Sequence, residues 1–247
     1  MNVLSIGNSF SMDAQTYLHR VAKAEGESLF CVNLYIPGCH LERHFHNIAD
    51  DRKDYEIQVC GKSDGGYTSV KEALLSEKWD VITLQQASHF SMDFATYVPY
   101  LEEIAAFVRQ HASDAKLYLH ETWGYESGSE RIRYYGFETM REMSECVFDA
   151  YRQARALIDA DGMIPSGHAM LALAEAGKTP AHRDTFHASL GAGRYLLACV
   201  WYEILTGKRV TNESFSDFDT LVLEETLAHV RDVAHQTVIE FLESEGK

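Results

Sequence analysis

The chain has 247 residues, 46% of them hydrophobic, and carries 37 acidic against 22 basic side chains, for a net charge of −15. This length supports one substantial core, so we expect a single domain over residues 1–247. The acidic balance argues against nucleic-acid binding, which needs clustered Lys and Arg. No stretch reaches the roughly 20 apolar residues of a membrane span. With no export signal visible at the N-terminus, we expect a cytoplasmic protein.

The predicted elements alternate along the chain. Val3, Leu4 and Ile6 predict a buried first strand that ends at Gly7. Apolar spacing then predicts helices at 11–26, 68–79, 95–112, 137–160, 189–207 and 218–244, and further strands at 28–38, 80–86, 115–123 and 162–165. Segment 56–69 fits the alternation poorly and is interpreted as a loop or a short hairpin. Five strands alternating with helices predict a parallel sheet covered on both faces.

The ligand crevice of such a sheet lies beyond the carboxyl ends of its strands. The segments expected there are 7–11, 37–40, 85–89, 121–123 and 165–168. A serine in the first of them would have unpartnered helix N–H groups beside its hydroxyl, which suits a nucleophile whose oxyanion must be stabilised. The alternative is that Ser9 or Ser11 is a helix N-cap.

Asp184 and His187 lie three residues apart before a predicted helix. At this spacing the carboxylate can orient the imidazole through one ring nitrogen, and the other nitrogen can take a proton from a serine. A structural surface contact is the alternative interpretation of the pair.

Several blocks of the sequence resemble the SGNH, or GDSL-like, hydrolases. Gly7-Asn8-Ser9 stands where many members have Gly-Asp-Ser, YIPGCH (35–40) resembles their glycine block, and RDTFHAS (183–189) resembles their terminal Asp-x-x-His block. WDVITLQQAS and DTFHASLGAGRYLLACVWYEILTG resemble the DUF4886 branch, and the similarity spans nearly the whole chain. The resemblance implies a flavodoxin-like three-layer α/β/α sandwich, the SGNH hydrolase fold, with a five-stranded, mainly parallel sheet.

The resemblance also implies residue roles. Ser9 would be the nucleophile, His187 the general base and later acid, and Asp184 its orienting carboxylate. The backbone N–H groups of Ser9 and Gly38 would donate to the oxyanion.

The chain lacks the Gly-x-Asn-Asp block from which most members supply a third oxyanion donor. Gln85 and Gln86 end the third predicted strand instead, and a glutamine amide can donate the same bond. Because successive strand side chains point to opposite faces, one of the two is expected to serve, with Gln86 favoured.

Other residues of the crevice loops are candidates for substrate binding. They are Asn8, His40, His89 and Trp123, since polar groups and flat rings could hold a sugar or an acyl chain. Core packing is an equal alternative for Trp123. Glu121 and His168 could also line the site.

Two further interpretations concern metals and thiols. His40 and His44 would share a helix face and, with His46, could bind a catalytic metal, although surface or pocket histidines are the simpler interpretation. The five cysteines lack CxxC spacing and are interpreted as buried free thiols. Cys39 remains a minor candidate nucleophile because it follows Gly38.

We therefore expect a serine hydrolase that cleaves carboxylic esters through an acyl-enzyme, with neither cofactor nor metal. Its partner would be a small-molecule ester, such as an O-acetylated carbohydrate, with no nucleic acid and no membrane. The alternatives are a non-catalytic ligand-binding module and a metal-dependent hydrolase centred on His40, His44 and His46.

Overall fold

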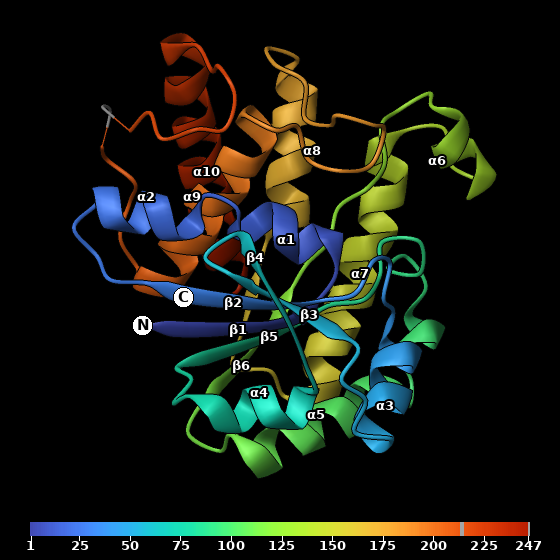
Figure 1. Ribbon diagram of the computed structural model, residues 1–247. Coiled ribbons are helices and arrows are strands. Elements are labelled where there is room, and N and C mark those ends of the chain that lie inside the picture. Colours follow the sequence, from blue (N-terminus) through green and yellow to red (C-terminus); the bar gives the residue numbers. More distant parts are fainter. Residues whose placement is uncertain (213–214, 247) are drawn as a thin grey trace.

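A seven-stranded sheet in the order β4-β3-β2-β1-β5-β6-β7 forms the centre of the computed structural model, which describes residues 1–212 and 215–246 (Figure 1). The strands β2, β1, β5, β6 and β7 pair in parallel. Strand β3 pairs antiparallel with both β2 and β4. The strands are β1 (Asn2–Gly7), β2 (Phe30–Tyr35), β3 (Tyr55–Val59), β4 (Lys62–Thr68), β5 (Val81–Leu84), β6 (Lys116–His120) and β7 (Gly162–Ile164). The predicted α/β class with a mainly parallel sheet is confirmed.

The predicted strand number is wrong, because segment 56–69 adds two strands. The hairpin interpretation of this segment is the correct one: β3 pairs with β2 and β4 forms the sheet edge. Its sequence hides the strands, since β4 contains Gly65 and Gly66 and is mostly exposed, so no apolar alternation marks it. The hairpin does not line the pocket described below.

Helices cover both faces of the sheet (Figure 1). One face carries α1 (Ser9–Gln15), α2 (Leu18–Ala24), α8 (Ser166–Ala176), α9 (Ala192–Thr206) and α10 (Glu224–Ser244). The other carries α3 (Leu41–Ala49), α4 (Val70–Ser76) and α5 (Tyr100–His111), which follows a 3-10 turn, η1 (Phe94–Thr96). The long α7 (Met140–Ile158) packs on helices of both layers, and the short α6 (Glu130–Tyr134) projects from the body. Within the described ranges, no helix has the length and apolar character to cross a bilayer.

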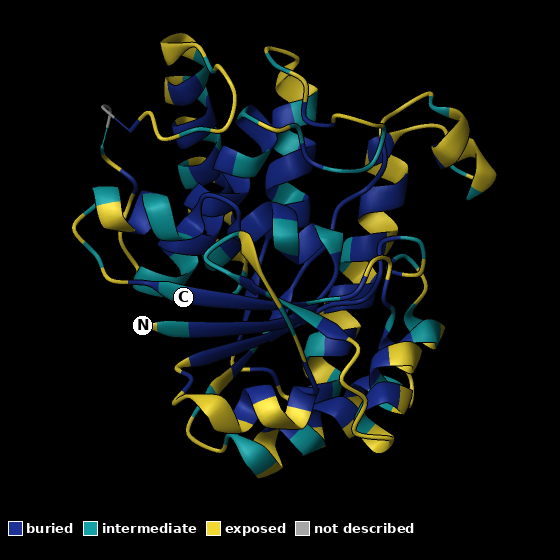
Figure 2. Ribbon diagram, in the orientation of Figure 1, coloured by how far each residue is buried: buried dark blue, intermediate teal, exposed yellow. Residues whose placement is uncertain are grey.

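The core is divided by the sheet, whose five parallel strands are largely buried, whereas the edge strand β4 is mostly exposed (Figure 2). Alternate residues of one strand serve opposite faces: Val3 packs among α1, α2, α8 and α9, whereas Leu4 and Ile6 pack among α3, α4 and α5. Both sets are fully or nearly fully buried. The apolar strand composition therefore follows from burial on two sides.

Several predicted helix limits differ from the structure. The helix predicted at 11–26 begins at Ser9 and is divided into α1 and α2, and the one predicted at 95–112 begins only after Pro99 as α5. The helix predicted at 218–244 begins at Glu224. The helices α3, α6 and α8 were not predicted; of these, α6 has only five residues.

Candidate active site

The turn from β1 into α1 leaves Ser9 without a capping role. Asn8 is the N-cap: its Oδ1 accepts from the Phe10 N–H at 2.9 Å, and Ser11 Oγ accepts from the Asn8 N–H at 3.0 Å. Gly7 is required here, because a Cβ atom at this position would lie 2.0 Å from Ser11 Oγ. The N-cap alternative therefore applies to neither serine, and the Ser9 hydroxyl is free for other partners.

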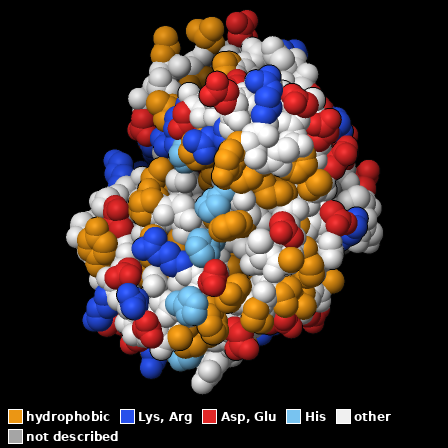
Figure 3. All heavy atoms as spheres, turned by 90° about the vertical axis from the view of Figure 1, so that its right-hand side faces the viewer, with side chains coloured by type: hydrophobic (Ala, Val, Ile, Leu, Met, Phe, Trp, Pro, Cys, Tyr) orange, Lys and Arg blue, Asp and Glu red, His pale blue; other side chains and the backbone are white. Residues whose placement is uncertain are grey.

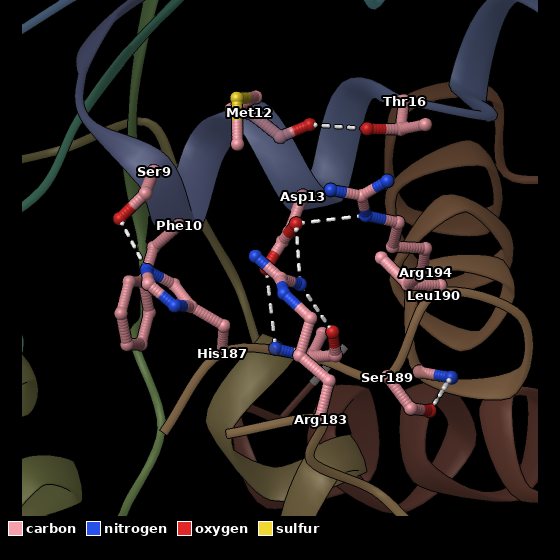
Figure 4. Close-up of polar contacts among 12 residues, drawn as sticks. Ser9, Phe10, Met12, Asp13, Thr16, Arg183, His187, Ser189, Leu190 and Arg194 are labelled. Carbon is pink, nitrogen blue, oxygen red and sulfur yellow. Dashed lines mark hydrogen bonds and ion pairs between the residues drawn. The ribbon is translucent and has the colours of Figure 1, made fainter. Parts of the chain in front are cut away.

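Ser9, His187 and Asp184 form a continuous chain of hydrogen bonds. His187 Nε2 lies 2.9 Å from Ser9 Oγ (Figure 4). The His187 Nδ1 lies 2.8 Å from Asp184 Oδ2. The His187 N–H also donates to Asp184 Oδ1 at 2.9 Å. An ionised carboxylate only accepts, so Nδ1 carries hydrogen and Nε2 faces the serine with its lone pair. The geometry is that of a base ready to take the Ser9 proton.

The Asp184 carboxylate is held in its charged form. Partial burial alone would raise its pKa, but hydrogen bonds from the His187 side chain and backbone, together with the charge of Arg183, bring the pKa below its usual value. Asp184 is thus an acceptor throughout the neutral pH range.

A second carboxylate, Asp13, joins the serine helix, α1, to the histidine loop, which is the segment 177–191 between α8 and α9. Asp13 follows Ser9 by one helical turn and is fully buried. It accepts from Arg183 Nη1 at 3.0 and 2.9 Å, from Arg194 Nε at 2.8 Å and from the Ala188 N–H at 3.1 Å (Figure 4). These bonds hold residues just before Asp184 and just after His187. Sequence reasoning missed Asp13, because its partners lie about 170 residues away.

Trp123 anchors the histidine loop through a buried hydrogen bond. Its Nε1–H donates to the Phe186 carbonyl at 2.7 Å, and its ring stacks on Phe10 with centroids 4.1 Å apart. It is fully buried and does not line the pocket over Ser9. The predicted contact of Trp123 with substrate is therefore wrong, and the core-packing alternative is correct.

Two backbone N–H groups near Ser9 have no partner in the described part of the protein: those of Ser9 and Gly38. Gly38 adopts a φ of +60°, which glycine tolerates and most side chains do not. Asn8 Nδ2 donates to the Cys39 carbonyl at 3.0 Å and thereby holds this loop beside the serine. Asn8 lines the pocket, although its side chain is engaged in these structural bonds.

Gln85 and Gln86 do not offer their amides to the pocket. Gln85 Nε2 donates to Asn8 Oδ1 at 2.8 Å, and its Oε1 lies 2.8 Å from His120 Nδ1. Gln86 Nε2 donates to the Thr96 carbonyl and hydroxyl, at 3.0 and 3.1 Å. Both are buried and neither lines the pocket. This placement contradicts their predicted role as oxyanion donors: both glutamines brace the neighbouring loops.

The histidines of segment 40–46 diverge. His40 caps α3 and contacts His89 with ring centroids 6.5 Å apart, His44 is buried with Nδ1 3.0 Å from the Tyr55 hydroxyl, and His46 is exposed. Burial lowers the pKa of His44 to about 3. No group of three or more His, Cys, Asp or Glu side chains in the described ranges converges as metal ligands would. The geometry gives no support to the metal alternative.

The remaining predicted residues have mixed positions. His89 lines the pocket, whereas His40 does not. Glu121 is buried and pairs with His168, away from the pocket, with Oε1 2.8 Å from Nδ1. Burial raises the pKa of the Cys39 thiol to about 12, which makes it a poor nucleophile. Cys146 is exposed and Cys60 partly so, and both differ from the predicted buried state.

The pocket over Ser9 includes residues that sequence reasoning did not assign. Tyr35, Tyr135, Phe186 and Arg131 line it together with Ser9, His187 and Gly38. Arg131 comes from α6, a helix of five residues that is too short for its spacing to be recognised. Figure 3 shows histidine side chains in a row on this face of the molecule, with Lys or Arg side chains at its upper end.

The mostly parallel sheet flanked by helices matches the fold of solved SGNH hydrolase structures. A solved structure from Slackia heliotrinireducens, described as a candidate SGNH hydrolase, has a TM-score of 0.58 at 21% identity, over 83% of this chain and 98% of that one. TesA has a TM-score of 0.54 at 16% identity, over 84% and 99%. These TM-scores show a common fold.

A further solved structure shows the family. A DUF4886 family protein from Bacteroides uniformis ATCC 8492 is 32% identical with a TM-score of 0.85, over 97% of this chain and 95% of that one. Residues 2–237 match the family described as "Domain of unknown function (DUF4886)". The chain belongs to the DUF4886 family, as the sequence blocks predicted. Among the curated proteins, none matches it.

Proposed function

We propose that this protein is a serine esterase that transfers an acyl group from a small ester to water. The observation that carries the proposal is the chain of hydrogen bonds from Ser9 through His187 to Asp184, at the wall of an open pocket. A capped, purely structural serine would not need an oriented imidazole at its hydroxyl. The fold shared with SGNH hydrolases supports the same chemistry.

In this mechanism Ser9 Oγ attacks the ester carbonyl while His187 Nε2 takes its proton. The N–H groups of Ser9 and Gly38 donate to the oxyanion that develops. His187 then gives the proton to the leaving alcohol, and the acyl-enzyme forms. Water, activated by His187 in the same way, releases the acid. No metal ion is required at any step.

The substrate class that we propose is a small acyl ester, with an O-acetyl group on a carbohydrate as the first candidate. Tyrosines 35 and 135 and Phe186 give the pocket flat, partly polar walls on which a sugar ring can pack.

Hydrolysis of p-nitrophenyl acetate tests the proposal. Ser9→Ala and His187→Ala should each abolish turnover, and EDTA should leave the wild type unchanged. Ser113→Ala, an exposed serine at the opposite end of β6, is the matched control and should retain full activity. A neutral fluorophosphonate probe should label the wild type and not Ser9→Ala. Activity that survives Ser9→Ala, or absence of labelling, would favour the non-catalytic ligand-binding module.

A further inference from the structure

The pocket over Ser9 has an unusual charge for this protein. The chain carries a net charge of −15, yet no Asp or Glu side chain of the described residues lines this pocket, and Arg131 does. Anions are therefore repelled by the molecule as a whole and attracted only at close range within the site.

The guanidinium of Arg131 is held by aromatic rings and is paired with no carboxylate in the described part of the chain. It lies 4.0 Å from the centroid of the Phe186 ring and 5.8 Å from that of Tyr125. Glu126 and Glu130 border an adjoining hollow with Arg131, but among the ion pairs of residues 1–212 and 215–246 none involves Arg131. By contrast, Arg133 on the same helix pairs with Glu138 at 3.2 Å and does not line the pocket.

The other basic side chains of the pocket do not share this property. Burial, reinforced by the neighbouring His40 and by Arg131, lowers the pKa of His89, so its imidazole is neutral at pH 7. His187 is committed to Ser9 and Asp184. Arg131 thus supplies the permanent positive charge on the pocket wall.

Arg131 also lies on the His187 side of Ser9. The Phe186 ring beneath its guanidinium packs against the His187 imidazole, with ring centroids 3.8 Å apart and the ring planes tilted by 36°. In acyl transfer the base that activates the serine also protonates the leaving oxygen, so the alcohol part of the ester leaves past His187. Arg131 is therefore one aromatic ring away from the leaving alcohol.

Resting on the proposed esterase function, we propose that Arg131 binds an anionic group, a carboxylate or a phosphate, on the alcohol part of the substrate ester. The planar guanidinium can donate two parallel hydrogen bonds to either group. This makes Arg131 a specificity-determining residue, and it narrows the substrate class to acyl esters of acidic alcohols, such as an acidic sugar.

Paired aryl acetates of equal shape test the proposal. 3-Acetoxybenzoate carries a carboxylate on its alcohol part, and 3-acetoxybenzamide carries a neutral amide in the same place. The wild type should show the higher kcat/KM for the carboxylate. Arg131→Gln should reduce the carboxylate-to-amide ratio about tenfold, the usual effect of losing a charge-assisted hydrogen bond. Arg133→Gln removes the same charge from the same helix and should leave the ratio unchanged.

Three results would overturn the proposal. One is an unchanged ratio in Arg131→Gln, and another is an equal loss in both variants, which would assign the effect to the general charge of α6. The third is a preference confined to the acyl side, measured with mono-p-nitrophenyl glutarate against the p-nitrophenyl ester of glutaric acid monoamide.

Failure of the esterase function can be told apart from failure of this inference. Fluorophosphonate labelling of Ser9 in the wild type and in Arg131→Gln reports the reactive serine without an anionic ligand. Calorimetric binding of 3-acetoxybenzoate to Ser9→Ala, with and without Arg131→Gln, reports anion recognition without turnover. Binding that is about tenfold weaker in the double variant supports the inference whatever the esterase assay gives, and equal binding contradicts it.

Discussion

Ser9 and His187 meet across 2.9 Å, yet the chain positions them by different means. Ser9 stands at a strand-to-helix turn whose capping bonds come from Asn8 and Ser11, its immediate neighbours. His187 lies in a loop between α8 and α9 whose anchors, Asp13 and Trp123, are distant in sequence. Ser9 is placed by local structure, and His187 is placed by tertiary contacts.

The backbone of the histidine loop shows the same dependence on its surroundings. Thr185 has a φ of 73°, a conformation that β-branched residues avoid, and its carbonyl accepts from the Glu126 N–H at 2.7 Å. A loop that contains such a residue keeps its form only where neighbouring contacts impose it. We therefore expect substitutions around the histidine loop to affect catalysis more than equivalent substitutions around the serine turn.

The largest expected effect comes from Asp184→Asn. The amide cannot fix the His187 tautomer as the carboxylate does, so kcat/KM for p-nitrophenyl acetate should fall roughly 10³-fold or more while the melting temperature stays close to that of the wild type. Asp114→Asn, an exposed acid on another loop, is the control. A loss of less than about tenfold would mean that Asp184 does not orient the base.

Asp13→Asn breaks the link between the serine helix and the histidine loop. Two arginines lose a buried partner, which should lower the free energy of unfolding by about 3 kcal/mol, and misplacement of His187 should lower kcat roughly 10- to 100-fold. KM should change little, because Asp13 does not line the pocket.

The matched control for this change is Asp232→Asn. Asp232 forms an exposed ion pair with Arg209 at 2.9 Å, and its loss should cost at most about 1 kcal/mol without any effect on kcat. Equal effects of the two substitutions would contradict the role of Asp13 in positioning the histidine loop.

Gln86→Leu tests whether Gln86 stabilises the loops that it contacts or donates to the oxyanion. The substitution leaves the Leu41 N–H and the Thr96 carbonyl without their partner, so denaturant unfolding should show a loss of about 1–3 kcal/mol. The rate should fall less than tenfold under folded conditions. A drop of roughly 10²- to 10³-fold at unchanged stability would instead restore the oxyanion role predicted from the sequence.

The smallest effect on activity is expected from the Glu121–His168 pair, because neither residue lines the pocket over Ser9. Burial alone would lower the pKa of His168, but the charge of Glu121 and its hydrogen bond raise that pKa above the ordinary value of 6.5. A raised folded-state pKa means that proton binding favours the native state. The stabilisation is therefore complete below about pH 6.5 and is lost as the pH rises through the folded-state pKa.

Thermal unfolding of His168→Gln measures this contribution. The deficit in melting temperature relative to the wild type should be larger near pH 5.5 than near pH 8.5, with activity on p-nitrophenyl acetate preserved in assays at about pH 7.5. A deficit that grows with pH would contradict the assigned direction of the His168 pKa.

The sequence predicts the features that depend on local patterns. Apolar runs located all five parallel strands, and the GNS and Asp-x-x-His blocks located Ser9, Asp184 and His187. Features that depend on distant partners were missed. Asp13 looks like an ordinary helix residue until Arg183 and Arg194 are beside it.

The errors at Gln85, Gln86 and Trp123 have a common physical cause. Each residue lies at the carboxyl end of a strand, where polar and aromatic groups can either face the ligand or brace the loops. The choice depends on which buried backbone groups need partners, such as the Thr96 and Phe186 carbonyls, and this is fixed only in the folded chain. Position at the crevice predicts proximity to the site and does not predict orientation.

The hairpin of β3 and β4 has a consequence for how the molecule behaves among copies of itself. Without it, the parallel strand β2 would end the sheet with a long row of free N–H and C=O groups. The outermost strand is instead β4, which combines Lys62 and Asp64 with two adjacent glycines and pairs with β3 through an irregular register. Charged, irregular edges are poor templates for an added strand. The opposite edge strand, β7, is only three residues long and buried. Both edges of the sheet therefore disfavour edge-to-edge aggregation.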